Sequence, residues 1–421
     1  MTPSIGRRTF LKGAAAAGGL AAGPFVMRRP AWSQNGLKGI DTIFGQAVES
    51  GAMPGIIAVA ATDGGMLYEG AFGKRELGKD APMTLDTVVW IASMTKAITS
   101  TAAMQLVEQG KLNLESPASE VVSDLAAAKV LEGFNADGKP RLRAPTRAIT
   151  LKHLLTHTAG FGYDIWDPAL VKYQAATDTP GIGSCKNKAL TTPLMFDPGD
   201  RWEYGISIDW VGKMVETTSG EKLDQYFQKN IFGPLGMKDT SFKISPSQRA
   251  RLASIHQRDD KGALAPIQFE LPQEPEFFMG GGGLYGTAPD YLIFAQMIMR
   301  GGTLKGAQVL RPETVALMSQ NHLGLLNIGP LKTAIPALSN DVELFPGMTK
   351  KWGLSFLINS QPAPTGRSAG SLAWAGLANT YFWIDSPRQV CGVFLSQVFP
   401  FWDRTAIDLL GKFETEVYRT I

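Results

Sequence analysis

The segment from residue 88 to residue 110 constrains the fold most, because it places a serine and a lysine at the start of an almost uniformly apolar helix. Residues 88–92 are apolar, Ser-Met-Thr-Lys follows at 93–96, and apolar residues then recur up to Val107. Gly110 provides a stop signal. A helix that is apolar on almost all sides is buried in a protein core. We therefore expect the core of this chain to form around this helix.

Ser93 and Lys96 lie three residues apart, so on a helix they share one face and the lysine amine can reach the serine oxygen. The amine acts as a base only when it is neutral. A helix N-terminus carries partial positive charge and burial disfavours an ammonium ion, so both lower the pKa of Lys96. The Ser93 backbone N–H can also donate to an oxyanion. The pair predicts a nucleophile that needs no histidine; the alternative is that Ser93 merely caps a core helix.

A second Ser-x-x-Lys string occurs at residues 219–222. It lies at a Ser-Gly break between two helical patterns, where Ser219 is expected to end a helix and Lys222 to face solvent. The context therefore favours Ser93 as the reactive serine.

The first 33 residues have the features of a bacterial export signal. A twin-arginine motif begins at Arg7, a weakly apolar run covers 13–27, and residues 31–33 resemble a small-x-small cleavage site. The apolar run is too short to span a membrane. We expect 1–33 to be a twin-arginine signal peptide, and the mature protein to lie in the periplasm without a membrane anchor once the signal is removed.

Charge and cysteine content exclude two classes of protein. The signal contains five of the 41 basic residues and no acidic one, which leaves 36 basic against 38 acidic residues, a net charge of about −2. No dense basic stripe with interleaved aromatic residues is present, so we expect no nucleic-acid partner. Cys185 and Cys391 are too few for a disulfide scaffold. Two buried free thiols are expected rather than a bridge.

Strand patterns lie at both ends of the chain, and helical patterns lie between them. We expect a helix over 36–50, then strands over 55–61 and 66–72 joined by a turn. Near the other end, three strand-rich segments and a closing helix follow at 352–358, 372–384, 389–398 and 406–418. The pattern in between is mainly helical, with long loops at 134–148 and 178–200. These features predict an α+β fold: one antiparallel sheet built from both chain ends, flanking helices, and an inserted mainly helical region.

The expected organisation is a single domain over residues 34–421. An α/β part is formed by 34–85 and 346–421, and a mainly helical part by 86–345.

Chemistry at Ser93 and Lys96 also needs a group that passes the proton to the leaving atom. Tyr204 is the candidate, because it lies just before an amphipathic helix expected over 208–217, where its phenol can sit beside a cleft. A lysine close by would lower the pKa of this phenol. In isolation, such a tyrosine would be interpreted as a packing residue.

A third element is Trp-Ala-Gly-Leu at residues 374–377, in a strand pattern near the C-terminus. Gly376 allows the backbone to approach a ligand closely. The N–H of Leu377 could then be a second oxyanion donor opposite that of Ser93.

These elements, in the order Ser-x-x-Lys, Tyr and Trp-x-Gly, resemble the serine β-lactamase and penicillin-binding-protein superfamily. The sequence looks most like the class C-like branch of family VIII carboxylesterases, which is similar to lovastatin-type acyltransferases and 6-aminohexanoate-dimer hydrolases. The resemblance covers essentially all of 36–415 and implies a β-lactamase/transpeptidase-like fold. Stretches that support it are 154–161, 233–237, 280–284 and 376–385.

The resemblance also implies roles for individual residues. Ser93 would be the acylated nucleophile, Lys96 its proton acceptor or electrostatic support, and Tyr204 a general base and acid. Which of the last two takes the first proton stays open. Oxyanion and substrate binding would fall to Trp374, Gly376 and Leu377.

Two departures from the β-lactamase pattern bear on the substrate. Trp374 stands where the lysine of a Lys-Thr-Gly motif helps to hold the β-lactam carboxylate, and Ile206 stands at the asparagine of a Tyr-x-Asn motif. Both changes replace polar recognition by apolar surface. The cleft is therefore expected to suit a neutral acyl ester better than an anionic lactam.

Three other motifs suggest different chemistry, but each lacks a residue that this chemistry requires. Ser368 lies in a Gly-x-Ser-x-Gly string, but all four histidines precede it, whereas an α/β-hydrolase elbow needs a later one. His153 and His157 have zinc-site spacing, but a leucine replaces the glutamate of a metalloprotease. We expect these histidines to satisfy backbone groups. The glycines at 280–283 lack the Gly-Lys-Ser/Thr of a phosphate loop, and we expect them to supply tight backbone near the site.

The sequence therefore predicts a serine hydrolase that cleaves small-molecule neutral esters through an acyl-enzyme, with no metal or cofactor. The alternatives are a β-lactamase, D-amino-acid peptidase or amide hydrolase of the same fold, and a non-catalytic cell-wall or ligand-binding module. The acyl and alcohol halves, hydrolysis versus acyl transfer, and the oligomeric state stay open. The aromatic candidates for an acyl pocket are Phe161, Trp166, Tyr285 and Phe399.

Overall fold

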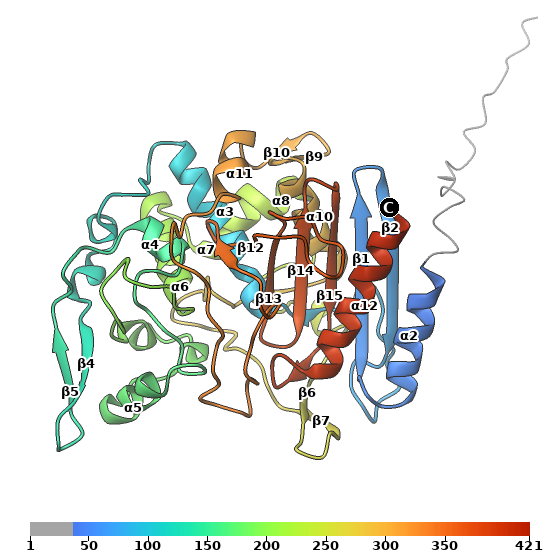
Figure 1. Cartoon of the computed structure of the whole chain (residues 1–421), viewed down its shortest axis with the longest axis horizontal. Coiled ribbons are helices and arrows are strands. Elements are labelled where there is room, and N and C mark those ends of the chain that lie inside the picture. The colour runs from blue at the N-terminus through green and yellow to red at the C-terminus, as the bar shows by residue number, and fades with distance from the viewer. Residues whose placement is uncertain (1–36) are drawn as a thin grey trace, which may run out of the picture.

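A computed structural model describes residues 37–421 of the chain (Figure 1). The predicted twin-arginine motif and cleavage site lie outside these residues. No helix in the described part is both long enough and apolar enough to cross a membrane.

A seven-stranded antiparallel sheet joins the two ends of the described chain, which confirms the predicted α+β architecture (Figure 1). The strand order is β11-β12-β13-β14-β15-β1-β2. Strands β1 and β15 pair from Ile57 opposite Leu395 to Thr62 opposite Val390, so the N-terminal hairpin docks on the C-terminal strands. The strands are β1 (Gly55–Thr62), β2 (Gly65–Gly73), β11 (Lys350–Trp352), β12 (Leu357–Asn359), β13 (Leu372–Gly376), β14 (Thr380–Asp385) and β15 (Val390–Leu395).

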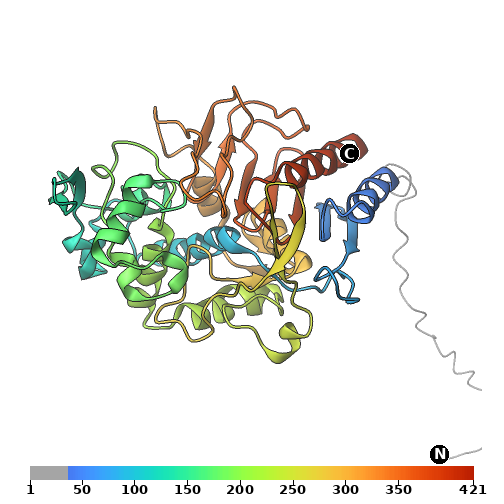
Figure 2. The same cartoon turned by 90° about the horizontal axis from the view of Figure 1, so that it is seen from below.

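Helices cover both faces of this sheet. The terminal helices α2 (Lys38–Glu49) and α12 (Arg404–Thr420) pack together on one face, and α10 (Ala288–Met299) lies on the other (Figures 1 and 2). Phe382 and Trp383 are neighbours on β14 and therefore point to opposite faces. The Phe382 ring contacts Tyr291 of α10, whereas the Trp383 ring contacts Phe413 of α12.

The inserted region is built around α3 (Thr95–Glu108), whose buried residues confirm the predicted core helix. It packs against α6 (Ser207–Ser219). The remaining helices are α4 (Leu151–Leu155), α5 (Pro168–Thr177), α7 (Leu223–Phe227), α8 (Gly233–Leu235), α9 (Pro246–Arg249) and α11 (Pro312–Met318). Short 3₁₀ or π turns lie at Ala92–Met94, Ala118–Glu120, Ser123–Ala127, Ile182–Ser184, Asn187–Thr191 and Gln228–Phe232.

Short strands in this region were not predicted. The first part of the expected loop at 134–148 forms a hairpin. Residues 398 and 399, the end of the predicted strand segment 389–398 and the residue after it, join a separate three-stranded sheet. The pairs and trio are β3 (Val89–Trp90) with β8 (Tyr285–Gly286), β4 (Val130–Phe134) with β5 (Pro140–Arg143), β9 (Thr303–Leu304) with β10 (Ala307–Gln308), and β16 (Val398–Phe399) with β6 (Ile255–Arg258) and β7 (Leu264–Ile267).

The three predicted C-terminal strand segments are each broken in the structure. Residues 352–358 turn at Ser355, whose φ is 80°, and residues 372–384 turn at Asn379, whose φ is 57°. The third segment ends β15 at Leu395 before β16 starts. Because residues in these turns are also buried, apolar composition alone does not mark where the strands end.

Candidate active site

Ser93 lies in the 3₁₀ turn Ala92–Met94 between β3 and α3. The N-cap of α3 is Met94, so the alternative that Ser93 caps the helix is wrong. Strand β13 passes directly against this turn at Gly376. A Cβ on Gly376 would lie 2.3 Å from the carbonyl oxygen of Ile91 and 3.1 Å from the Ala92 Cβ. Gly376 therefore serves first to bring the strand against the serine turn, and only a residue without a side chain fits there.

The amine of Lys96 is buried and lies among three oxygen atoms. Its Nζ is 3.1 Å from Ser93 Oγ, 2.9 Å from the Tyr163 hydroxyl and 2.6 Å from the Gly281 carbonyl oxygen. Burial lowers the pKa of Lys96, and the Asp209 carboxyl group acts in the opposite direction. The structure thus brings the serine and the lysine together, as their spacing indicates.

Tyr204 enters the same site from the loop before α6. Its hydroxyl oxygen accepts a hydrogen bond of 2.9 Å from the Trp374 indole N–H, and its ring centre lies 4.7 Å from Lys96 Nζ. Burial raises the pKa of Tyr204, and hydrogen bonding with Ser93 and with Trp374 opposes this increase. The expectation that the lysine lowers this pKa is therefore wrong. A buried phenolate loses its hydration, and Lys96 in the same site is itself driven towards the neutral form.

Tyr163 is a site residue that the sequence analysis missed. It is buried in the loop after α4, and burial raises its pKa well above the ordinary value for tyrosine. Its hydroxyl lies at hydrogen-bonding distance from the Lys96 amine. The one sequence signal was its position two residues beyond the stretch 154–161, which supported the family resemblance.

The glycines at 280–283 do supply tight backbone beside the site. The Gly280 carbonyl accepts a hydrogen bond of 2.6 Å from Thr99 Oγ1. The Gly282 carbonyl accepts one of 2.7 Å from the Trp90 indole N–H. Together with the Gly281 carbonyl at Lys96, these contacts tie the glycine segment to the helix that carries the lysine.

A cavity of about 300 Å³ opens at Ser93. Aromatic and aliphatic side chains form most of its wall, and Asp164 is the one carboxylate among the residues that line it. Burial raises the pKa of Asp164. The wall therefore offers no cation to a substrate carboxylate. Other residues along this cavity include Trp90, Tyr163, Trp166, Phe269, Leu271 and Leu377.

A small adjoining pocket holds the other predicted site residues. Ser93 and Tyr204 line it together with Trp374, Gly376 and Leu377. The structure therefore brings the other five predicted site residues, Lys96 included, around Ser93.

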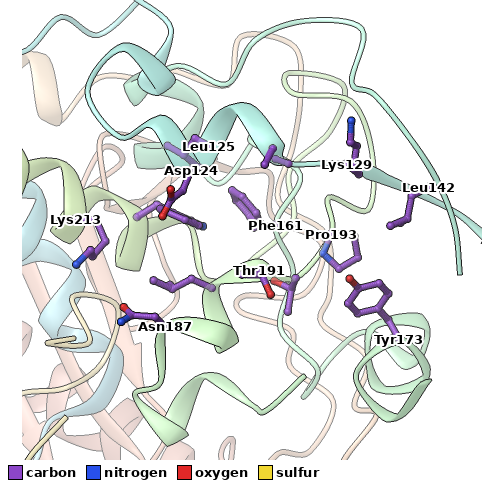
Figure 3. Close-up of a pocket in the computed structure, with 15 residues that line it drawn as sticks. Asp124, Leu125, Lys129, Leu142, Phe161, Tyr173, Asn187, Thr191, Pro193 and Lys213 are labelled. Atoms are coloured by element: carbon purple, nitrogen blue, oxygen red, sulfur yellow. The ribbon is translucent and has the colours of Figure 1, made fainter. Parts of the chain in front are cut away.

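Three of the four aromatic residues predicted for the acyl pocket are placed elsewhere. Trp166 lines the cavity at Ser93. The Tyr285 hydroxyl accepts a hydrogen bond from the Leu271 N–H, and Phe399 is buried in the core. Phe161 lines a different cavity of about 610 Å³, shown in Figure 3, which contains neither Ser93 nor Tyr204. Composition marked these residues as apolar without indicating which surface they face.

The histidines accept hydrogen bonds from backbone groups, as expected. His153 Nδ1 accepts from the Thr150 N–H at 3.2 Å, and His157 Nδ1 accepts from the Gly205 N–H at 3.4 Å. Burial lowers the pKa of His157 well below the usual value, so the ring is neutral. Within residues 37–421, no group of three His, Cys, Asp or Glu side chains is arranged to hold a metal ion.

The other candidate motifs also have structural roles. Ser368 lies in the loop between β12 and β13, and its N–H donates to Asp385. Ser219 is the last residue of α6, and Lys222 is exposed to solvent. The cysteines are free and buried, as predicted, at positions 185 and 391.

Comparisons with known proteins agree with this geometry. The beta-lactamase family model matches residues 40–412. Lovastatin esterase from Penicillium rubens is 34% identical over 400 residues, covering 90% of this chain and 98% of that protein. Monacolin J acid methylbutanoyltransferase from Aspergillus terreus is 33% identical over 402 residues, covering 90% of this chain and 95% of that protein. Among solved structures, a mutant simvastatin synthase from Aspergillus terreus superposes with a TM-score of 0.80 at 31% identity. The superposition covers 91% of this chain and 97% of that protein.

Proposed function

This chain belongs to the beta-lactamase family, and from that membership we propose that it is a serine hydrolase that cleaves small neutral esters through an acyl-enzyme on Ser93. Its relatives include an esterase and acyltransferases, which support an enzyme that acts on esters. We further propose that it acts in the periplasm after export.

The observation that carries this proposal is the set of partners around Lys96. A neutral amine has two N–H donors and one lone pair, whereas an ammonium ion has three donors and no acceptor. Two of the three oxygens at Lys96, those of Gly281 and Tyr163, can accept its N–H groups. Once the amine has lost a proton, these two contacts leave its lone pair available to the Ser93 hydroxyl, whose Oγ lies 3.1 Å away. This arrangement suits a neutral base, which the buried position of the amine also favours.

The proposed acylation follows from this geometry. Ser93 Oγ attacks the ester carbonyl carbon while its proton passes to Lys96. Tyr204, which burial keeps as a phenol, donates its proton to the leaving alkoxide and recovers one from the Lys96 ammonium. The backbone N–H groups of Ser93 and Leu377, which border the same cavity, hold the oxyanion. Water then attacks the acyl-enzyme and releases the acid, with the proton transfers reversed.

The walls of the cleft support a neutral substrate. A lactam or a peptide C-terminus carries a carboxylate, and the cavity at Ser93 has one acid and no basic side chain along it. Leaving such a carboxylate without a partner costs binding energy. The lack of a basic partner for a carboxylate therefore argues against β-lactam or D-amino-acid peptide substrates.

Acyl transfer to an alcohol is a second candidate, because one relative is named as a methylbutanoyltransferase. An apolar cleft also favours an alcohol over water as the acceptor of the acyl group. Adding increasing concentrations of butanol to the ester assay would separate the two reactions. Rising butyl ester with falling free acid indicates transfer, and unchanged acid release indicates hydrolysis.

The proposal is tested by measuring rates on p-nitrophenyl butyrate, nitrocefin and a D-Ala-D-Ala peptide. We expect ester turnover far above lactam or peptide turnover, and an acyl adduct on Ser93 detected by mass spectrometry. Ser93→Ala should abolish both. Ser368→Ala, which removes the serine of the other hydrolase-like string, should change neither. Efficient lactam turnover without ester cleavage would contradict the esterase proposal, and no turnover or adduct at all would favour a non-catalytic binding module.

A further inference from the structure

Asp209 is a buried carboxylate that the reaction described above does not use. It lies in the first turn of α6, five residues after Tyr204, and its side chain is fully excluded from solvent. Its Oδ1 accepts a hydrogen bond of 2.8 Å from the Gly281 N–H. Among residues 37–421, its Oδ2 has no hydrogen-bond partner. Burying a carboxylate with one oxygen unpaired costs free energy.

The peptide group on which Asp209 acts is the one that holds the lysine. The N–H of Gly281 donates to Asp209, and the carbonyl of the same residue accepts from Lys96 Nζ at 2.6 Å. The carboxylate packs flat against this glycine, because a Cβ on Gly281 would lie 2.4 Å from Asp209 Oδ2. The preceding carbonyl, that of Gly280, is fixed to α3 through Thr99. The segment 280–281 thus bridges α6 and α3 next to the amine.

Asp209 also provides the charge that faces Lys96. The other titratable groups around the amine are Tyr163 and Tyr204, which burial keeps protonated, and His157, which burial keeps neutral. Cys185 faces Asp209, and burial raises the pKa of this thiol to about 12, so it adds no charge. Lys96 and Asp209 therefore titrate as a pair: burial raises the pKa of Asp209, and the lysine opposes that change.

We propose that Asp209 is a positioning residue for the proposed reaction: it holds the Gly281 peptide so that the carbonyl directs the Lys96 amine at Ser93, and it supplies the buried negative charge that this amine faces. The inference rests on the proposed function for its catalytic meaning. The contact itself, from carboxylate to peptide to amine, is independent of which substrate is cleaved.

The charge of Asp209 raises the pKa of Lys96, whereas burial lowers it. Removing this charge should therefore change the pKa of Lys96 in a known direction. Asp209→Asn keeps an oxygen that can accept from the Gly281 N–H but removes the charge, so the pKa of Lys96 should fall further. If neutral Lys96 is the base, the acid limb of the kcat/KM profile should move to lower pH by about one unit.

Asp209→Ala should behave differently from Asp209→Asn, because it also frees the Gly281 peptide. We expect kcat to fall roughly ten- to hundredfold at every pH, since the amine is no longer held at Ser93. The matched control is Asp290→Asn in α10. Asp290 is likewise a buried carboxylate that accepts a backbone N–H, from Asp239 at 2.8 Å, but it does not contact the site. The control should leave the pH profile in place, whatever its effect on the melting temperature.

A second readout does not depend on turnover. The chain is labelled with ¹³C,¹⁵N-lysine, the Lys96 signal is assigned by its loss in Lys96→Arg, and its Cε shift is followed against pH in the wild-type and Asp209→Asn proteins. A lower midpoint in the variant supports the inference even if no ester is cleaved, in which case the proposed function fails alone. Equal midpoints, or an Asp209→Ala protein with wild-type kcat and pH profile, would overturn the inference while leaving the esterase proposal intact.

Discussion

The indole N–H of Trp374 donates a hydrogen bond of 2.9 Å to the hydroxyl oxygen of Tyr204. Trp374 occupies the position where the resemblance places the lysine of a β-lactamase. The side chain that replaces this lysine therefore binds a residue of the enzyme itself rather than a substrate carboxylate. By occupying one lone pair of the phenol oxygen, the indole restricts where the Tyr204 proton can point.

Trp374→Phe should lower kcat with little effect on KM, because it removes the hydrogen bond that orients Tyr204 but keeps an aromatic wall. A neutral hydrogen bond contributes about 1 kcal/mol, which corresponds to roughly a fivefold change in rate. Steady-state kinetics on p-nitrophenyl butyrate measure the effect. Trp383→Phe, a buried indole on the same sheet whose N–H has no partner in the described chain, is the control and should leave kcat unchanged. Equal losses in both variants would contradict the orienting role.

Lys96→Met should abolish Ser93 acylation while the protein stays folded. Met has a similar length and no base, so kcat should fall by roughly a thousandfold or more. Acyl adduct formation with p-nitrophenyl butyrate, followed by mass spectrometry, measures this directly. Lys222→Met removes the exposed lysine of the second Ser-x-x-Lys string and should have no effect. A Lys96→Met protein that still acylates at near wild-type rates would remove Lys96 from the proposed mechanism.

The stability of the protein should rise with pH in the alkaline range because of Lys96. Burial lowers the pKa of Lys96 in the folded state, whereas in the unfolded chain it is about 10.4. Between these two values the unfolded state binds more protons, so the free energy of unfolding increases with pH and levels off above the unfolded pKa. Urea unfolding of the wild-type and Lys96→Met proteins from about pH 8 to 10 measures the difference. If the two proteins changed in parallel over this range, the lowered pKa would be refuted.

Gly376→Ala should destabilise the protein and slow catalysis together. The new Cβ would lie 2.3 Å from the Ile91 carbonyl oxygen and 2.3 Å from Thr380 Oγ1, so β13 must move away from the serine turn. Overpacking of this kind costs about 1–3 kcal/mol in unfolding free energy. Gly411→Ala in α12 is the control, because its Cβ meets nothing within 4 Å and alanine favours a helix. It should be neutral or stabilising, and a Gly376→Ala protein that behaved like it would refute the close-contact argument.

Much of the site could be predicted because its signals are local in sequence. The three-residue spacing of Ser93 and Lys96 fixes their approach within one turn of chain. Tyr204 and Trp374 were found by their order and family pattern rather than by any contact between them. The aromatic candidates for the acyl pocket show the limit of this approach: only Trp166 faces the cavity at Ser93. Apolar character predicts burial but not the surface against which a residue is buried.

The sequence by itself determined that both chain ends would form one antiparallel sheet, that a buried helix would carry Lys96, and that a serine would precede it. These follow from short-range periodicity and spacing, which the backbone imposes locally. Only the tertiary structure decided that Tyr163, Asp209 and Gly281 would surround that lysine. These residues come from three separate segments, and no spacing relates them. Their convergence is set by how α3, α6 and the glycine segment pack, and this packing places the amine in the buried site that lowers its pKa.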